Sequence, residues 1–381
     1  MWIYDEKNWP NFIWDEKSLT SLLVEARHRQ GRLLGKMEAL GFPIRLEANL
    51  NILTTDVVTS SAIEGERLDT DEVRSSIARR LGILLQNDKP VGRDIEGIVE
   101  VMLDATQNFN QALTVERLFD WHAALFPTGR SGMHRITVGA WRPQETGPMQ
   151  VVSGPIGHEM VHFEALIASR LDAEMTKFLS WFEIDLALDP VLKAGIAHLW
   201  FVTIHPFEDG NGRIARVIAD MALARADRTS SRFYSMSRQI EKERNAYYTQ
   251  LERQQKGSLD ITSWLSWFLN CFSNAIDNAI DNAEETLSSV LFKAELWNLV
   301  NSAPVNERQR FIINRMLDNF KGHMTTSKYA KLAKCSSDTA LRDMRELVNR
   351  HILIQNPGGG RSTSYRLITV EELERSGNDV V

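Results

Sequence analysis

One short segment, residues 205–216, constrains the fold of this chain more than any other. It reads His-Pro-Phe-Glu-Asp-Gly-Asn-Gly-Arg-Ile-Ala-Arg, and apolar stretches with helical patterning flank it at 194–204 and 214–226. Pro206 has no backbone N–H and disfavours helical dihedrals at His205, so the first helix is expected to end there. The segment therefore predicts two helices joined by a tight, polar turn.

Glycines and arginines give this turn the properties of a phosphate-binding site. Gly210 and Gly212 are expected to take positive φ and to let a ligand approach the backbone. The second helix is expected to begin near Asn211, so that its free N–H groups face an anion in the turn. Arg213 and Arg216 lie on one helical face, where both can bind phosphate oxygens. Each residue alone has an ordinary structural explanation, but together they predict phosphate chemistry.

The segment resembles the motif of the Fic family, His-Pro-Phe-x-Asp/Asn-Gly-Asn-Gly-Arg-x-x-Arg, at every fixed position. Most Fic proteins are adenylyltransferases that move AMP from ATP to a protein hydroxyl. The resemblance implies that His205 is the general base, a role that suits an imidazole near neutral pH. It further implies that Phe207 is buried and anchors the loop, and that Asp209 holds Mg²⁺ against the α- and β-phosphates.

The same resemblance implies the contacts to ATP. Gly210, Asn211 and Gly212 would form the phosphate cavity, and Arg213 would contact the outer phosphates. Doc-like relatives, which phosphorylate instead, carry Lys where Gly212 stands, so Gly212 favours AMP transfer. Tyr247 or Tyr248 would lie against adenine, although a buried packing role suits either equally. The residues expected to contact the nucleotide are Glu208, Asp209, Gly210, Asn211, Gly212, Arg213, Arg216, Tyr247 and Tyr248.

A second motif, Ser-Ser-Ala-Ile-Glu-Gly at residues 60–65, lies upstream at the end of a helical stretch. Gly65 is placed as a C-terminal helix cap, which leaves Glu64 in the last turn. By spacing alone, Glu64 could be an ordinary exposed glutamate. From Ser60 to Gly65, however, the chain resembles the inhibitory motif Ser/Thr-x-x-x-Glu-Gly/Asn in its N-terminal, intramolecular form. This implies that Glu64 pairs with Arg216 and keeps the γ-phosphate out of its productive position.

Composition indicates an ordinary soluble protein. The chain has 381 residues, of which 43% are hydrophobic and 25% charged, and no apolar run reaches the roughly 18 residues that span a bilayer. A secretory signal begins with basic residues followed by an apolar run, whereas this chain has acidic residues near its start. Cys271 and Cys335 have no metal-ligand spacing and are expected to be reduced core thiols. We therefore expect a cytoplasmic protein with no membrane partner.

The pattern of elements predicts a mainly α fold in three parts. Residues 1–85 are expected to form an N-terminal helical region carrying the inhibitory motif, with helices near 18–40 and 46–63. Residues 90–285 are expected to form a Fic-type helical catalytic domain. Residues 290–370 are expected to form a winged helix-turn-helix domain.

The stretch from Ile136 to Gly154 departs from helical patterning. Apolar residues surround Pro143, Gly147 and Pro148, which predicts a β-hairpin. By resemblance to Fic proteins this hairpin would be the flap over the active site, which pairs with the backbone of the target as an added strand. A simple surface hairpin is the alternative.

The C-terminal region changes character. Helices are expected at 307–318, 326–333 and 340–350, followed by short strands at 352–354 and 365–367 around a glycine-rich turn. This order is typical of a winged helix-turn-helix.

Residues 321–367 are locally basic, which phosphate contact with DNA would require. Arg342 and Arg345 are the candidate DNA contacts. A protein-docking or dimerising module is an equal alternative, so a homodimer is also expected. The basic residues are Lys321, Lys328, Lys331, Lys334, Arg342, Arg345, Arg350, Arg361 and Arg366, against the acidic residues Asp338, Asp343 and Glu346.

The sequence therefore favours an autoinhibited adenylyltransferase that uses ATP and Mg²⁺. It would modify a Ser, Thr or Tyr hydroxyl of a target protein or of itself. The alternatives are a winged-helix transcription regulator with a nucleotide-sensing Fic body, and an enzyme that removes AMP at the same site.

Overall fold

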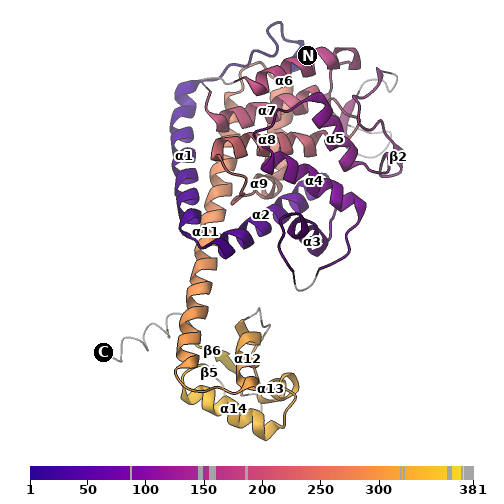
Figure 1. Cartoon of the computed structure of the whole chain (residues 1–381). Coiled ribbons are helices and arrows are strands. Elements are labelled where there is room, and N and C mark those ends of the chain that lie inside the picture. The colour runs from indigo at the N-terminus through magenta and orange to yellow at the C-terminus, as the bar shows by residue number, and fades with distance from the viewer. Residues whose placement is uncertain are drawn as a thin grey trace. The chain divides into compact units, whose positions relative to one another are not determined.

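The chain is mainly helical, as the sequence predicts (Figure 1). It divides into two compact units, Met1–Asp281 and Asn282–Val381. None of the helices within the described ranges is long and apolar enough to cross a membrane. The computed structural model describes residues 1–85, 88–144, 149–153, 160–184, 188–317, 320, 322–357, 363–369 and 372.

The first unit is built from packed helices around a central pair, α7 and α8, which almost completely lack exposed residues. The expected helices at 18–40 and 46–63 are confirmed as α1 and α2. The helices of this unit are α1 (Glu16–Ala39), α2 (Phe42–Ile63), α3 (Thr70–Arg80), α4 (Arg93–Gln107), α5 (Val115–Leu125), α6 (Leu171–Glu183), α7 (Pro190–Ile204), α8 (Asn211–Asp227), α9 (Met236–Lys242), α10 (Arg244–Gln255) and the beginning of α11 (Thr262–Asn301).

The boundaries of α7 follow from its sequence. Asp189 caps the helix by accepting a hydrogen bond from the Val191 N–H at 2.8 Å, and Pro190 occupies the first turn, where its missing N–H costs nothing. The apolar body of α7 is buried among its neighbours, and the Trp264 indole N–H of α11 donates to the Gly195 carbonyl at 2.8 Å. The helix ends at Ile204, directly before the predicted turn.

The N-terminal region packs onto the other helices of the first unit. The Trp9 indole N–H donates to Glu174 of α6 at 2.8 Å, and Ile13 forms an isolated parallel bridge with Asp260. Helix α2 lies against both α8 and α9. The end of α2 is thereby fixed beside the start of α8.

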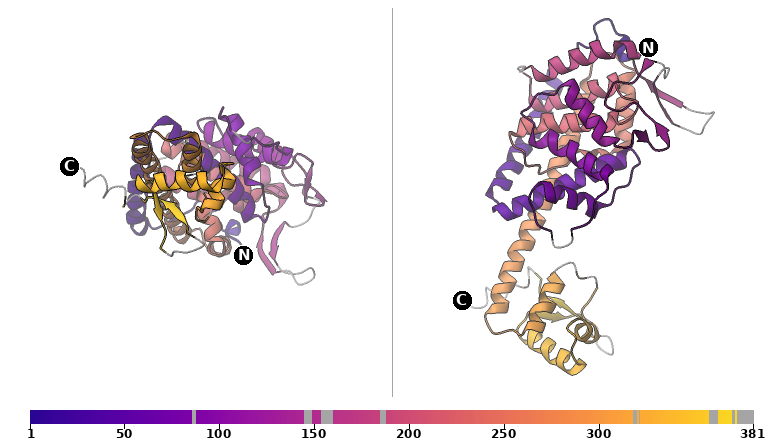
Figure 2. Two further views of the ribbon diagram at one scale, coloured as in Figure 1. Left: turned by 90° about the horizontal axis from the view of Figure 1, so that it is seen from below. Right: turned by 45° about the vertical axis from the view of Figure 1, so that its right-hand side comes forward.

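The predicted hairpin is present but displaced along the chain. Strand β3 (Gln150–Ser153) pairs antiparallel with β4 (Met160–Glu164), so the prediction over 136–154 is wrong in its position. Arg142 explains why the earlier segment is not a strand, because its backbone N–H donates to the Pro206 carbonyl at 2.9 Å. Gly147, Pro148 and Gly154 lie outside the described residues. Both views of Figure 2 show β3 and β4 at the edge of the unit.

The two-residue strands β1 (Arg130–Ser131) and β2 (His134–Arg135) form a second, smaller hairpin. Its turn contains Gly132 at φ 54°. This hairpin is not evident in the sequence, because its strands are too short to show an alternating pattern.

The second unit contains its elements in the predicted order. Helices α12 (Glu307–Leu317), α13 (Thr326–Leu332) and α14 (Ser337–Asn349) precede the antiparallel pair β5 (Leu353–Gln355) and β6 (Tyr365–Leu367). Met324 adds an isolated antiparallel bridge to Tyr365. The core of this unit includes Ile312, Ile313, Met344, Leu347 and Leu353.

The charged residues at the surface of the second unit are not the same set as the basic and acidic residues counted in the sequence between 321 and 367. Asp343 is buried and accepts hydrogen bonds from Arg308 and Tyr329, so it is an internal acid rather than a surface one. Lys321 and Arg361 lie outside the described residues. Of the two free cysteines, Cys271 is buried as expected, whereas Cys335 is only partly buried.

Two helical glycines provide a matched test of packing between α4 and α5. A Cβ on Gly97 would lie 1.9 Å from the Ala124 carbonyl oxygen, whereas one on Gly31 of α1 would meet nothing within 4 Å. We expect Gly97→Ala to lower the free energy of unfolding by about 2 to 4 kcal/mol, because the backbones must separate. Gly31→Ala should raise it by about 0.5 to 1 kcal/mol. Thermal unfolding measures both, and equal melting temperatures would contradict the close contact.

Candidate active site

The turn between α7 and α8 is closed by one side chain. The Phe207 N–H donates to Asn211 Oδ1 at 3.0 Å, and Asn211 Nδ2 donates back to the Phe207 carbonyl at 2.8 Å. Phe207 is fully buried, as predicted, and its ring stacks on His122 with centroids 4.1 Å apart. The amide of Asn211, expected in the phosphate cavity, is therefore used to hold the loop, and only its backbone N–H remains for an anion.

His205 sits in a conformation that the loop must hold in place. Its backbone has φ 54° and ψ 59°, in the left-handed region that a non-glycine residue rarely adopts. Buried Arg142 supports it: Nε donates to the His205 carbonyl at 2.9 Å, and Nη2 donates to the Leu166 carbonyl. Sequence reasoning missed Arg142, since nothing in its local sequence connects it to a residue 63 positions away.

The His205 ring is arranged as a base. Burial lowers the pKa of His205 to about 4, so the imidazole is neutral at pH 7. Nδ1 lies 3.3 Å from the Val202 carbonyl, an acceptor that requires the proton on Nδ1. Nε2 is then the unprotonated nitrogen, able to accept a proton from a hydroxyl group.

A second buried histidine, which the sequence analysis also missed, supports the loop. The Gly139 N–H donates to His122 Nδ1 at 3.2 Å, so the proton of this ring lies on Nε2 and is donated to the Asp209 carbonyl, also at 3.2 Å. Burial lowers the pKa of His122 to about 4, which keeps the ring neutral. His122 thus holds the turn by stacking and by one hydrogen bond.

The start of α8 has the unpaired N–H groups that the sequence predicts, with one correction. Gly210 has φ 82°, as predicted, but Gly212 is the second residue of the helix and does not take positive φ. The first helical bond described runs from the Ile214 N–H to the Gly210 carbonyl, so the N–H groups of residues 211–213 lie in the unpaired first turn. Gly212 serves packing instead: a Cβ there would lie 2.2 Å from Glu64 Oε1.

Arg216 joins α8 to the end of α2. It is 2% exposed, and its Nη2 donates to Glu64 Oε1 at 2.8 Å and to the Ser60 carbonyl at 2.9 Å. Its Nε donates to Ser60 Oγ at 3.0 Å. Burial opposes the charge on Arg216, but the Glu64 carboxylate outweighs it and raises the pKa of the guanidinium. Gly65 closes α2 at φ 86°, the expected cap conformation.

Arg213 has its own carboxylate partner, which the sequence analysis did not identify. Its Nη1 donates to Glu66 Oε2 at 2.8 Å, and its guanidinium lies over the Phe126 ring, 4.9 Å from the centroid. Arg213 is 4% exposed. Both arginines of the turn are therefore buried and paired with acids from the segment after α2.

The two acids of the turn have different surroundings. Glu208 Oε2 accepts a hydrogen bond from the Thr137 N–H at 2.5 Å, so the side chain expected to contact nucleotide is engaged with a neighbouring loop. Asp209 accepts hydrogen bonds from its neighbour Gly210 at 2.6 Å and from Ser131.

The donor set around Asp209 fits Mg²⁺ held jointly with a nucleotide. The part of the chain that the structure describes contains no cluster of three or more metal-ligating side chains. Mg²⁺ commonly uses one or two carboxylates, water and substrate phosphates, so a single partly exposed aspartate beside a helix N-terminus is sufficient.

A cavity of about 630 Å³ adjoins the turn and has the size of a small-ligand site. Both predicted tyrosines line it. Tyr247 is buried, with its hydroxyl 2.9 Å from His198 Nε2, whereas Tyr248 is 38% exposed and donates to the Ile63 carbonyl at 3.3 Å. The lining residues are Glu64, Val151, Val152, Ser153, His162, Phe163, Val202, His205, Gly212, Arg244, Asn245, Tyr247, Tyr248, Thr249, Leu251, Glu252 and Gln255.

The β3–β4 hairpin forms one wall of this cavity. Ser153 Oγ lies 2.6 Å from His162 Nε2, and His162 Nδ1 lies 2.9 Å from Glu252 Oε2 of α10. The hairpin is thereby tied to the helix that carries the two tyrosines, and the Phe163 ring of β4 lies 6.5 Å from the His205 ring.

Comparison with known proteins agrees with this geometry. The model of the Fic/DOC family matches residues 112–223, which include the turn and most of α8. The chain contains a Fic domain. Residues 2–83 match a separate domain of unknown function, DUF4172.

Two curated relatives are similar to parts of the chain. Protein adenylyltransferase fic-1 of Caenorhabditis briggsae is 28% identical over 168 residues, 43% of this chain and 30% of that protein. Protein adenylyltransferase Fic of Culex quinquefasciatus is 26% identical over 217 residues, 54% of this chain and 40% of that protein. The chain therefore matches less than half the length of each.

A solved structure supports the fold over most of the chain. A Fic family protein from Desulfovibrio desulfuricans G20 aligns with a TM-score of 0.53 at 19% identity and covers 92% of this chain and 96% of its own.

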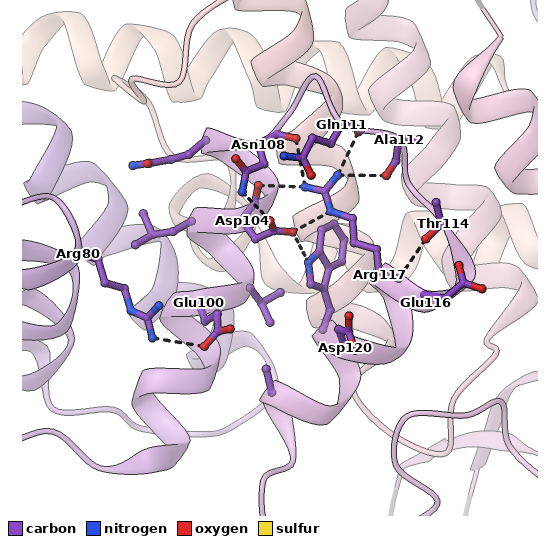
Figure 3. Close-up of a pocket in the computed structure, with 15 residues that line it drawn as sticks. Arg80, Glu100, Asp104, Asn108, Gln111, Ala112, Thr114, Glu116, Arg117 and Asp120 are labelled. Atoms are coloured by element: carbon purple, nitrogen blue, oxygen red, sulfur yellow. Dashed lines mark hydrogen bonds and ion pairs between the residues drawn. The ribbon is translucent and has the colours of Figure 1, made fainter.

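A larger hollow of about 900 Å³ lies beside α4 and α5. Figure 3 shows Arg117 bonded to Asp104 and to neighbouring residues, and Arg80 bonded to Glu100. Arg117 and Trp121 both donate to Asp104 Oδ2 at 2.7 Å, and Arg117 also binds the Asp104 carbonyl at 3.0 Å. These groups satisfy one another, whereas the cavity beside the turn is lined by His205, Gly212 and Glu64.

The low pKa of His205 gives a direct test of the base. Because burial disfavours the imidazolium, we expect the ring to stay neutral from pH 8 to about pH 5, well below the ordinary value of about 6.5. Side-chain NMR of labelled histidines, with His205→Ala to assign the signal, measures this. A His205 midpoint near 6.5 would contradict the burial that the turn imposes.

Proposed function

We propose that this chain is a protein adenylyltransferase that transfers AMP from ATP to a hydroxyl group of a target protein, or of itself, with release of pyrophosphate. The observation that carries the proposal is that a neutral His205, Gly212 of α8 and Glu64 line one cavity, and that Glu64 binds the buried Arg216. The Fic domain and the names of the relatives support the same reaction class.

The proposed chemistry assigns one role to each group. His205 Nε2 accepts the proton of the target hydroxyl while its oxygen attacks the α-phosphorus and pyrophosphate leaves. The N–H groups of residues 211–213 and the Arg213 guanidinium stabilise the phosphate charge that develops. Asp209 would hold Mg²⁺ with the phosphates, and the ion would neutralise part of their charge. Tyr248 offers an exposed ring for the adenine.

The position of Glu64 supports autoinhibition. Its carboxylate binds Arg216 at 2.8 Å and approaches Gly212 closely, where an outer phosphate oxygen of ATP would otherwise bind. A carboxylate and a phosphate oxygen compete for the same guanidinium donors. The resting enzyme therefore binds ATP in an unproductive position.

Removing Glu64 should activate the enzyme. With ATP labelled on the α-phosphate, we expect Glu64→Gly to raise the amount of protein-bound label by about 10-fold or more. A factor of this size lies within the range that typical coupling free energies between two sites produce. His205→Ala in the Glu64→Gly background should remove that label. Parallel label on the γ-phosphate should not be transferred. Absence of α-label from every lysate protein, with Glu64→Gly folded and Mg²⁺ present, would contradict AMP transfer.

Wild type and Glu64→Gly also test the alternative that the enzyme removes AMP. If the wild-type chain strips label from a pre-labelled target and Glu64→Gly does not, Glu64 positions a water and the enzyme is an AMP-removing hydrolase.

DNA binding by the second unit is the second candidate function. Arg342 and Arg345 are exposed on α14, but they line a surface hollow together with Asp338 and Glu346, so that face carries both charges. In a gel shift with random-sequence duplex DNA at low salt, we expect Arg342→Ala combined with Arg345→Ala to weaken binding about 10-fold or more. Equal binding by wild type and double variant would contradict α14 as the contact surface.

A further inference from the structure

The segment after α2 delivers two carboxylates to the site. Gly65 N–H donates to the Ala62 carbonyl and Glu66 N–H donates to the Ser61 carbonyl, both at 3.0 Å. With Gly65 at φ 86°, this pattern is a Schellman-type helix end, which fixes the residues on either side of the glycine. Glu64 and Glu66 are therefore positioned by the same backbone turn.

Each carboxylate takes one arginine of the Fic motif. Glu64 binds Arg216 and Glu66 binds Arg213, both at 2.8 Å. Arg213 is almost fully buried, and its Nε has no hydrogen-bond partner among the described residues. Glu66, by contrast, has a side chain that is 46% exposed. The two ion pairs neutralise both guanidiniums that the catalytic turn offers to a polyphosphate.

We propose that Glu66 is a second inhibitory carboxylate, which competes with the outer phosphates of ATP for Arg213 as Glu64 competes for Arg216. The inference rests on the proposed function, because it takes Arg213 as a ligand of those phosphates. Relief of inhibition then requires the release of two ion pairs. A nucleotide with only an α-phosphate requires the release of neither.

The surroundings of Arg213 make this exchange physically simple. Its guanidinium lies over the Phe126 ring, and Phe126 in turn contacts the turn at Gly210, where a Cβ would lie 2.9 Å from the ring. Loss of the Glu66 contact therefore leaves Arg213 in place with one face against an aromatic ring and its donors free. A phosphate oxygen can replace the carboxylate without a large movement of the arginine.

The two ion pairs differ in strength because the two glutamates differ in solvent exposure. The Glu64 side chain is 33% exposed and reaches a fully buried guanidinium, whereas the Glu66 side chain is more open to water. Water and salt screen the Glu66 pair more strongly. The Glu66–Arg213 ion pair is therefore the weaker of the two, and a polyphosphate or added salt breaks it first.

Nucleotide affinity tests the inference without relying on group transfer. Isothermal titration calorimetry would measure AMP, ADP and a non-hydrolysable ATP analogue, each with Mg²⁺, on wild type, Glu66→Gln, Glu64→Gly and the double variant. We expect Glu66→Gln to bind ADP and the ATP analogue about fivefold more tightly than wild type and AMP equally. The double variant should bind the ATP analogue more tightly than Glu64→Gly.

Glu47→Gln is the matched control, because Glu47 lies on α2, pairs with Arg74 at 2.6 Å and does not line the cavity. It should match wild type for all three nucleotides. The inference is overturned if Glu66→Gln equals wild type for the ATP analogue while Glu64→Gly binds it more tightly, or if AMP gains as much as ATP. Failure of every folded variant to bind any nucleotide would instead contradict the proposed function itself.

Discussion

A buried cation governs the architecture of this site. Arg216 is 2% exposed, and an unpaired guanidinium in such a place would cost several kcal/mol. The chain meets this requirement with the end of α2, where Ser60 and Glu64 bind the guanidinium. The N-terminal region is therefore held against the Fic domain by an electrostatic requirement, and in the proposed mechanism a polyphosphate competes for the same guanidinium.

The base and the phosphate-binding groups are prepared in opposite ways. Desolvation lowers the pKa of both His205 and His122, so each is neutral, and the hydrogen bonds of each ring define its tautomer. The arginines are buried with partners and remain charged. One turn thus combines an uncharged proton acceptor with two guanidiniums that are paired with acids, and phosphoryl transfer uses both kinds of group. The loop hydrogen bonds of Asn211 keep the two kinds of group at fixed separation.

The sequence predicted what is local and missed what is distant. The turn, the burial of Phe207, the left-handed Gly210 and the Gly65 cap follow from neighbouring residues, so their pattern is visible along the chain. Arg142 and Glu66 act on residues 63 and 147 positions away, and no periodicity connects them. The sequence predicts the hairpin too early in the chain, because Pro143 and its neighbours have the composition of a turn. The second strand of the hairpin is β4.

The residues at positions 64 and 212 constrain each other, although they are far apart in the sequence. Any side chain at 212 would occupy the space that the Glu64 carboxylate fills. A residue larger than glycine at 212 would therefore push the Glu64 carboxylate out of the position in which it binds Arg216. The absence of a side chain at 212 is thus what lets the acid of one segment reach the guanidinium of another.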